Sequence, residues 1–285
     1  NAFENYWLTH DKKAKGSGYK PFKRWEHIWE SRVDANGYLP TPEAQLNAWQ
    51  EKQSFGTANK MADVSNWLPY GPFQYNQANA QPAGLGRING MAVDPNDPNT
   101  WYIGSPGGGV WKTTDAAATW TPLSDNLPRA GVSSIAIDYN DSNIIYIATG
   151  DDDGGGRATS IGVYKSIDGG VTWNVTGLDL TLLDGIIRLS EIFIDPTDSN
   201  KLLCSSEDGI FRTTDAGVTW TKVLAGNNIR DMRLKPGDAQ TVYAVSPTTF
   251  YKSTDGGASF TQITNGVPSN TRRMVIDVTP ANPDY

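Results

Sequence analysis

An eight-residue pattern, S/T-x-D-x-G-x-T-W, occurs four times between residues 113 and 260. Its aspartates, which are 53, 47 and 40 residues apart, are Asp115, Asp168, Asp215 and Asp255. Two copies deviate from the pattern, the first with Ala117 in place of glycine and the last with Phe260 in place of tryptophan. A period of about 40–50 residues is typical of folds in which one structural unit recurs. The chain is therefore predicted to be a repeat protein.

Each copy of the pattern ends a longer unit that contains three earlier strand-like runs. The first runs, which stop near an aspartate, cover 88–94, 135–138 and 192–195. The second runs cover 100–103, 144–148, 201–205 and 241–245, and the third runs cover 110–113, 163–166, 210–213 and 250–253. The eight-residue pattern then turns the chain into a fourth strand. Four antiparallel strands in a unit of about 40–50 residues describe one blade of a β-propeller, so the predicted fold class is all-β.

The number of units predicts an incomplete propeller in this chain. About 200 residues follow residue 85, which is enough for about four and a half blades of this size, and a fifth unit begins at 271–277. Because propellers need several blades to close, we expect the propeller to continue in a larger protein.

The chemistry of the repeated turn explains its conserved spacing within the chain. The aspartate carboxylate can accept backbone N–H groups inside the hairpin, and the Ser/Thr hydroxyl can add a further bond. Glycine allows a positive φ where the turn needs one. The closing tryptophan is a large apolar group suited to packing between blades. The four aspartates are therefore predicted to be structural.

The pattern resembles the Asp box of BNR-repeat propellers, a group that includes sialidases, the sortilin (Vps10) ectodomain and two-propeller xyloglucanases. This resemblance covers about residues 67–285 and implies the fold rather than one activity, because the Asp box is a folding device that these proteins share. The segments 15–26, 86–89 and 107–112 also resemble secreted propeller proteins of Bacteroidetes. That resemblance implies a multi-domain protein exported as cargo of the type 9 secretion system.

Residues 1–60 differ in composition from the rest, with four of the ten tryptophans and nine Lys/Arg against seven acidic residues. Aromatic residues at helical spacing are Phe3, Trp7, Phe22, Trp25 and Trp29. The sequence Thr41-Pro42 predicts the start of a further helix, which would continue through Trp49. We predict a helical, aromatic arm over 1–60 and a partial propeller over 61–285. The aromatic faces either pack on the propeller or on one another, or they dock a partner.

Composition excludes several function classes. The net charge of −7 and the absence of a basic block argue against nucleic-acid binding. No apolar run approaches the roughly 18 residues of a membrane span. The single cysteine, Cys204, excludes an internal disulfide framework. Only two histidines, His10 and His27, are present, which argues against a histidine-based metal site.

The long loop after the second run of the second unit is rich in acidic residues and glycine. It contains Asp151, Asp152 and Asp153, followed by three glycines and Arg157. Clustered carboxylates can supply the oxygen ligands that Ca²⁺ prefers. The spacing is not that of an EF-hand, so two interpretations stay open, a Ca²⁺ site or a solvated loop paired with arginines. The second is favoured, and no other cofactor is predicted.

An arginine precedes the first run of four units. These residues are Arg87, Arg188, Arg230 and Arg272. They lie seven or five residues before the end of the first run, which predicts that all four lie on the same side of their strands. Converging arginines could bind a carboxylate, as the resemblance to sialidases implies. Pairing of the arginines with acidic loops is the simpler alternative.

The resemblance to xyloglucanases makes a further prediction. In that family a loop of the first blade reads Thr-Asp-Val-Gly-Gly, and its aspartate is catalytic. The matching residues here are 105–109, with Pro106 at the place of the acid. Glycoside hydrolysis ordinarily needs two carboxylates, and a proline supplies none. This departure argues against that activity.

These observations favour a non-enzymatic binding or scaffolding module of a secreted or cell-surface protein. The expected partners are a glycan, a surface protein or the outer-membrane export machinery. The alternative is a glycoside hydrolase of sialidase type that uses the four arginines.

Overall fold

The computed structural model describes most of the chain, namely residues 2–12, 14, 16–30, 32–34, 38, 40–54, 87–129, 131–152, 158–183, 187–267 and 271–281. The chain divides into two compact units, Asn1–Ser54 and Phe55–Tyr285. No helix among the described residues is long and apolar enough to cross a membrane.

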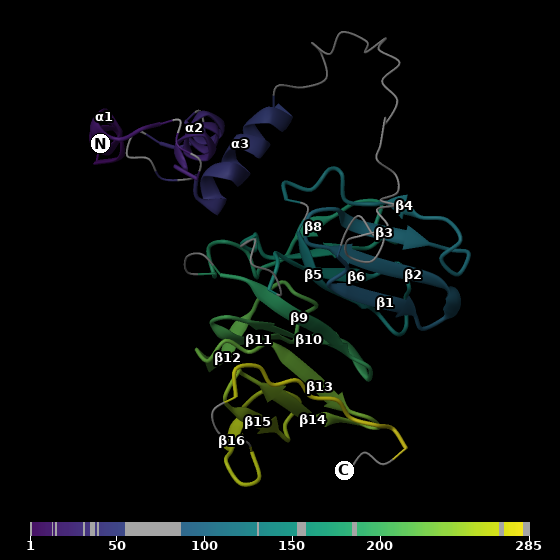
Figure 1. The fold of residues 1–285 in the computed structure, drawn as a ribbon. Helices are drawn as coiled ribbons and strands as arrows, with labels where there is room; N and C mark the ends of the chain where they lie inside the picture. Colours follow the sequence, from purple (N-terminus) through teal and green to yellow (C-terminus); the bar gives the residue numbers. More distant parts are fainter. Residues whose placement is uncertain are drawn as a thin grey trace, which may run out of the picture. The chain divides into compact units, whose positions relative to one another are not determined.

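The second unit is built from four antiparallel sheets of four strands each (Figure 1). The first sheet contains β1 (Gly90–Asp94), β2 (Asp97–Ser105), β3 (Gly109–Thr113) and β4 (Thr121–Pro122). The second contains β5 (Val132–Ile137), β6 (Ile145–Thr149), β7 (Val163–Ser166) and β8 (Asn174–Val175). The third contains β9 (Leu189–Asp195), β10 (Asp198–Ser206), β11 (Gly209–Thr213) and β12 (Thr221–Ala225). The fourth contains β13 (Asp231–Lys235), β14 (Asp238–Val245), β15 (Phe250–Ser253) and β16 (Thr261–Ile263).

Strands that are neighbours in the sequence are neighbours in every sheet, as expected for a propeller blade. Every predicted strand run from the first to the fourth unit overlaps an observed strand, and the prediction of a β-propeller of four-stranded blades is confirmed. The residues 271–281, predicted to begin a fifth blade, do not form a strand in the part that is described.

The apolar cores lie between blades rather than within one sheet. Tyr102 of the first blade shares a cluster with Ile147 of the second, and Tyr146 of the second shares one with Phe211 of the third. A third cluster joins Leu203 to the strands of the fourth blade. Blade-to-blade packing therefore buries the apolar faces that the alternating strands present.

The turns formed by the four copies of the eight-residue pattern contain hydrogen bonds of the kind expected from the sequence. In the second copy, Oδ1 of Asp168 accepts the backbone N–H of Thr172 at 2.8 Å, and Oδ2 accepts the Thr172 hydroxyl at 2.6 Å. The Ser166 hydroxyl donates to Oδ1 of Asp168 at 2.8 Å and accepts the N–H of Gly170. In the first copy, Ala117 takes the place of this glycine at a φ of 73°, so the turn keeps its left-handed shape without glycine.

These hydrogen bonds predict how the fold responds to acid. The bond from the Thr172 hydroxyl contributes most to lowering the pKa of Asp168 from 3.8 to about 2. A carboxylate with a depressed pKa contributes stability above the unfolded value, and that contribution is lost as pH falls from about 4 to 2. We expect Asp168→Ala to lower the Tm at pH 7 by about 2–6 °C, with the difference from the wild type shrinking near pH 2. Asp125→Ala, at an exposed loop position, is the control for thermal melting, and an equal loss there would contradict this role.

The first unit contains three helices, as the sequence predicted. These are α1 (Ala2–Thr9), α2 (Tyr19–Trp29) and α3 (Pro42–Ser54). The Thr41 hydroxyl accepts the backbone N–H of Ala44 at 3.2 Å and so caps α3. Trp7 is buried and lies edge-on to Tyr19, with 5.4 Å between ring centroids. Aromatic side chains therefore pack on one another within this unit.

Candidate functional site

A cavity of about 320 Å³ lies where the first strands of the four blades meet, and we call it the central pocket. Strand β5 contacts both β1 and β9, and β13 contacts β9. The pocket is lined by Asn89, Gly90, Met91, Ser133, Ser134, Asp152, Ser190, Glu191, Arg230, Asp231, Arg233, Arg273, Met274 and Val275. Most of these residues are polar, and the pocket is partly open, since Met91 and Val275 in its lining are exposed.

The lining residues occupy two repeated positions of the blades. The first run of each blade ends at Asp94, Asp138, Asp195 or Lys235, three of which pair with the opening residue of the next strand. Four residues before these ends stand Gly90, Ser134, Glu191 and Asp231. Five residues before them stand Asn89, Ser133, Ser190 and Arg230. We call these sets the linking level and the polar level.

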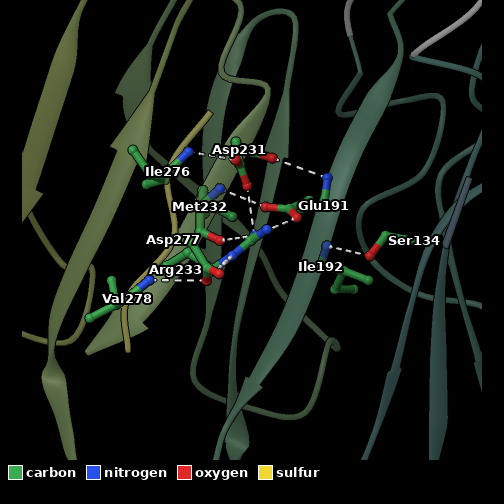
Figure 2. A network of polar contacts seen from close by, with 10 residues as sticks. Ser134, Glu191, Ile192, Asp231, Met232, Arg233, Ile276, Asp277 and Val278 are labelled. Carbon is green, nitrogen blue, oxygen red and sulfur yellow. Dashed lines mark hydrogen bonds and ion pairs between the residues drawn. The ribbon is translucent and has the colours of Figure 1, made fainter. Parts of the chain in front are cut away.

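Three side chains of the linking level, those of Ser134, Glu191 and Asp231, accept backbone N–H groups of the next blade or of the segment after the fourth blade (Figure 2). The Ser134 hydroxyl accepts the backbone N–H of Ile192 at 3.2 Å. Glu191 Oε2 accepts the N–H of Met232 at 2.5 Å, and Asp231 Oδ2 accepts the N–H of Ile276 at 2.9 Å. These bonds satisfy backbone donors that the edge of a blade would otherwise leave unpaired.

The first residue of the linking level is Gly90, at the point where β1 and β5 approach closely. A Cβ atom on Gly90 would lie 3.0 Å from the carbonyl oxygen of Ser133 and 3.0 Å from the Cα of Ser134. A side chain at this point would force the two backbones apart by a few tenths of an ångström. Between β1 and β5 the linking level therefore has no side chain. Between β5 and β9 the link is the hydroxyl of Ser134, and from β9 onward the links are the carboxylates of Glu191 and Asp231.

One arginine holds the two carboxylates of the linking level. Arg233 Nη1 lies 2.8 Å from Glu191 Oε1 and 2.6 Å from Asp231 Oδ1, and its Nε lies 3.7 Å from the exposed Asp277 (Figure 2). Burial raises the pKa of Glu191 to about 7, although the charge of Arg233 and the Met232 N–H oppose that rise. The arginine therefore keeps a strongly desolvated carboxylate in place.

The polar level differs because its side chains have hydrogen-bonding atoms without partners. Among the described residues, buried atoms that lack a partner include Asn89 Oδ1, Ser133 Oγ and Arg230 Nε. Oδ1 of Asp152, which enters the pocket from the loop after β6, is also buried without a partner. Unpaired buried polar atoms cost free energy, so their concentration at one pocket points to a ligand.

Asp152 is the carboxylate with the most exceptional environment. Burial raises its pKa, and the nearby Ser190 hydroxyl and Arg230 guanidinium oppose that rise. The charge of Glu207 adds a smaller increase, so Asp152 and Glu207 act on each other electrostatically. Glu207 is held by Arg188, whose guanidinium and backbone N–H both donate to it. One carboxyl thus favours its protonated form while its neighbour is paired with a cation.

Three of the four predicted arginines lie beside acidic loop residues, and Arg188 and Arg230 both act electrostatically on Asp152. Arg87 pairs with Asp151 at 2.5 Å, and Arg188 pairs with Glu207. Arg230 lines the central pocket, whereas Arg272 is exposed and does not line it. Of the three aspartates considered for Ca²⁺, Asp151 is buried against Arg87, and Asp153 lies outside the described residues. Within the described ranges, no three His, Cys, Asp or Glu side chains are arranged to hold a metal ion.

Sequence reasoning missed the residues of the linking level and Arg233, which pairs with two of them. Glu191, Asp231 and Arg233 stand at the polar positions of alternating strands, where solvent exposure is the usual expectation. Aligning the blades on their strand ends is the signal that finds them, because it places each polar residue at a repeated offset.

No family model matches the chain. Among curated relatives, the chain is 31% identical over 150 residues to "Xyloglucanase Xgh74A" of Acetivibrio thermocellus, an alignment that covers 49% of this chain and 18% of the relative. It is 25% identical over 183 residues to "Xyloglucanase" of Paenibacillus sp, covering 61% of this chain and 18% of the relative. The chain therefore spans less than a fifth of the length of these relatives.

Solved structures agree with the fold. The xyloglucanase of glycoside hydrolase family GH74 from Xanthomonas campestris superposes with a TM-score of 0.53 at 23% identity, covering 66% of this chain and 31% of that chain. YCF48, in a structure titled "YCF48 bound to D1 peptide", has a TM-score of 0.51 at 19% identity and covers 68% of this chain and 59% of that chain. At these identities the likeness concerns the fold alone.

The comparisons correct the functional expectations from sequence. The relatives at 25–31% identity are named as xyloglucanases, so the expectation of a non-enzymatic binding or scaffolding module, with an enzyme disfavoured, was wrong. The alternative of a sialidase-type hydrolase was also wrong, because these relatives are hydrolases of a different type. The error came from treating Pro106 as decisive, although the similarity extends over 150 residues or more.

Proposed function

We propose that this chain is a propeller segment of a glycoside hydrolase that acts on a xyloglucan-like polysaccharide. The similarity to named xyloglucanases over 150–183 residues carries the proposal. The charge-coupled carboxyls Asp152 and Glu207 support it from the chain's own chemistry. Because the alignment covers only 18% of each relative, the activity is proposed for the whole protein that contains this chain.

The two carboxyls have the division of roles that glycoside hydrolysis requires. A general acid must be protonated at the working pH, and burial raises the pKa of Asp152 in that direction. Glu207, paired with Arg188, is the partner carboxylate that activates water or stabilises positive charge on the sugar. Asp152 would donate its proton to the oxygen that leaves when the glycosidic bond breaks.

Asp152 and Glu207 would supply the carboxyl groups that the first blade lacks at Pro106. That residue lies in the turn between β2 and β3, and its carbonyl oxygen lies close to Gly131. Asp152 and Glu207 come from the corresponding turns of the second and third blades, after β6 and β10. The acid function is therefore proposed at the next two blades rather than at the first.

The test is the release of sugar from xyloglucan, with cellulose as a second polymer, followed by mass spectrometry of the products. We expect Asp152→Asn to reduce kcat/KM by about 100-fold or more, because the amide cannot donate the acid proton. Activity should fall as pH rises through the pKa of Asp152, since the acid must be protonated.

Asp208→Asn is the matched control for this experiment. Asp208 follows Glu207 in the same turn and pairs with Lys222 away from the pocket, so this variant should stay within about twofold of the wild type. The assay uses the whole protein that contains this chain. If the wild-type protein releases no sugar from either polymer, or if both variants lose activity equally, the proposed function is wrong.

The proposal includes a location outside the cell, because a polysaccharide of this class is too large to be reached from inside. The resemblance of 15–26 and 107–112 to secreted Bacteroidetes propellers supports export, and type 9 secretion is the route that this resemblance implies. Detection of the protein in culture medium, and its loss from the medium in a strain without that system, would test this part.

A further inference from the structure

The central pocket presents unpaired hydrogen-bonding atoms of both kinds. Asn89 Oδ1 and Asp152 Oδ1 are acceptors, Arg230 Nε is a donor, and the Ser133 hydroxyl can be either. Ser133 is 7% exposed, so bulk water does not solvate its hydroxyl freely. Ser190 Oγ is likewise buried without a partner, so among the described residues these atoms come from all four blades and from the loop after β6.

Most charged groups around the pocket are paired with one another. Its acidic side chains are Asp152, Glu191 and Asp231, and its arginines are Arg230, Arg233 and Arg273. Glu191 and Asp231 are tied to Arg233, and Arg230 acts on Asp152. With Asp152 protonated, an anionic ligand would meet little positive charge beyond Arg230, and a divalent cation would not find the several carboxylate oxygens that it needs. A neutral ligand with many hydroxyl groups fits the mixture of donors and acceptors.

The volume indicates how much of a ligand the pocket can hold. Its 320 Å³ stands at the lower end of the range of about 300–1,000 Å³ for ligand pockets. The pocket is partly open, since two of its lining residues, Met91 and Val275, are exposed. It can therefore hold about one sugar ring, whether free or part of a longer chain.

We infer that the central pocket binds a single uncharged sugar ring, with the polar level and Asp152 donating and accepting its hydroxyl hydrogen bonds. The identity of the sugar as part of a xyloglucan-like chain rests on the proposed function, whereas the binding itself does not need hydrolysis. Ser133 would thus be a binding residue at the axis, separate from the acid function assigned to Asp152 and Glu207.

Binding is tested by saturation-transfer NMR and calorimetric titration with xylose and cellobiose as neutral probes. Glucuronic acid and glucose 6-phosphate are the charged probes. We expect the neutral sugars to bind. Ser133→Ala should raise their Kd by about 3–10-fold, because one hydrogen bond to the sugar is lost. The Tm of Ser133→Ala should be unchanged or higher, because the hydroxyl that it removes is buried without a partner in the free protein.

Ser199→Ala is the matched control, since the Ser199 hydroxyl bonds Asn140 at the strand-end turns and does not line the pocket. Absence of binding by both neutral sugars, tighter binding of the charged sugars, or equal Kd values for the two serine variants would each overturn the inference. If neutral sugars bind through Ser133 while xyloglucan is not cleaved, the pocket stands and the proposed function fails. If xyloglucan is cleaved and Ser133→Ala changes neither Kd nor KM, the proposed function stands and the inference about the central pocket fails.

Discussion

The substitution Gly209→Ala is expected to leave little or no folded protein, or to lower the Tm by about 10 °C or more. Gly209 opens β11 at a φ of +118°, a backbone conformation that L-residues rarely adopt. A Cβ atom at this position would lie 1.9 Å from the carbonyl oxygen of Leu224 on the paired strand β12. The positions of the Cβ atom and of the carbonyl oxygen are both fixed by the paired backbones of β11 and β12, so the clash cannot be relieved by rotating a side chain.

Gly107→Ala is the control for this prediction. Gly107 lies in the β2–β3 turn of the first blade, and a Cβ atom there would have no neighbour within 4 Å. We expect its melting temperature to stay within about 2 °C of the wild type. Circular dichroism melts and soluble yield compare the two variants. A Gly209→Ala protein that melts like the control would show that β11 and β12 separate here at little cost.

The strands and Asp boxes could be predicted because their causes are local. Hydrophobic alternation with a period of two marks a strand, and Asp168 bonds to groups within four residues of it. Ala117 shows the limit of such reasoning. The glycine of the pattern suggests a strict conformational need, yet the first blade forms the same turn with alanine in the left-handed region.

The central pocket could not be predicted in the same way because its contacts join different blades. Glu191 and Arg233 are 42 residues apart, and Ser134 bonds Ile192 across 58 residues. Nothing near these residues in the sequence distinguishes them from the exposed polar positions of an ordinary strand. The four arginines were found from their spacing, but their partners depend on loop paths that spacing does not describe. Arg87 and Arg188 pair with loop carboxylates, which was the simpler of the two interpretations from sequence.

The second large effect is expected for Arg233→Met, which removes the cation between Glu191 and Asp231. Losing one partner of a fully buried ion pair typically costs about 3–5 kcal/mol, but Arg233 and Glu191 keep 37% and 28% of their side chains exposed, so a smaller loss is expected here. The folded-state pKa of Glu191, about 7, already exceeds its unfolded value of 4.5, so the folded protein binds more protons between these pH values. Stability from this group therefore falls as pH rises through that window.

In Arg233→Met the loss should depend strongly on pH. Without the opposing charge of Arg233, the pKa of Glu191 rises further, and the decline in stability continues above pH 7. Urea unfolding should show a variant mildly destabilised at pH 5 and destabilised by about 1–3 kcal/mol at pH 8. The double variant Glu191→Gln/Arg233→Met should recover part of the loss at pH 8, because an amide carries no charge to desolvate. Equal losses at the two pH values, or no recovery in the double variant, would mean that Arg233 acts through packing of its side chain. The linking level would then hold the blades together without depending on the charge of Glu191.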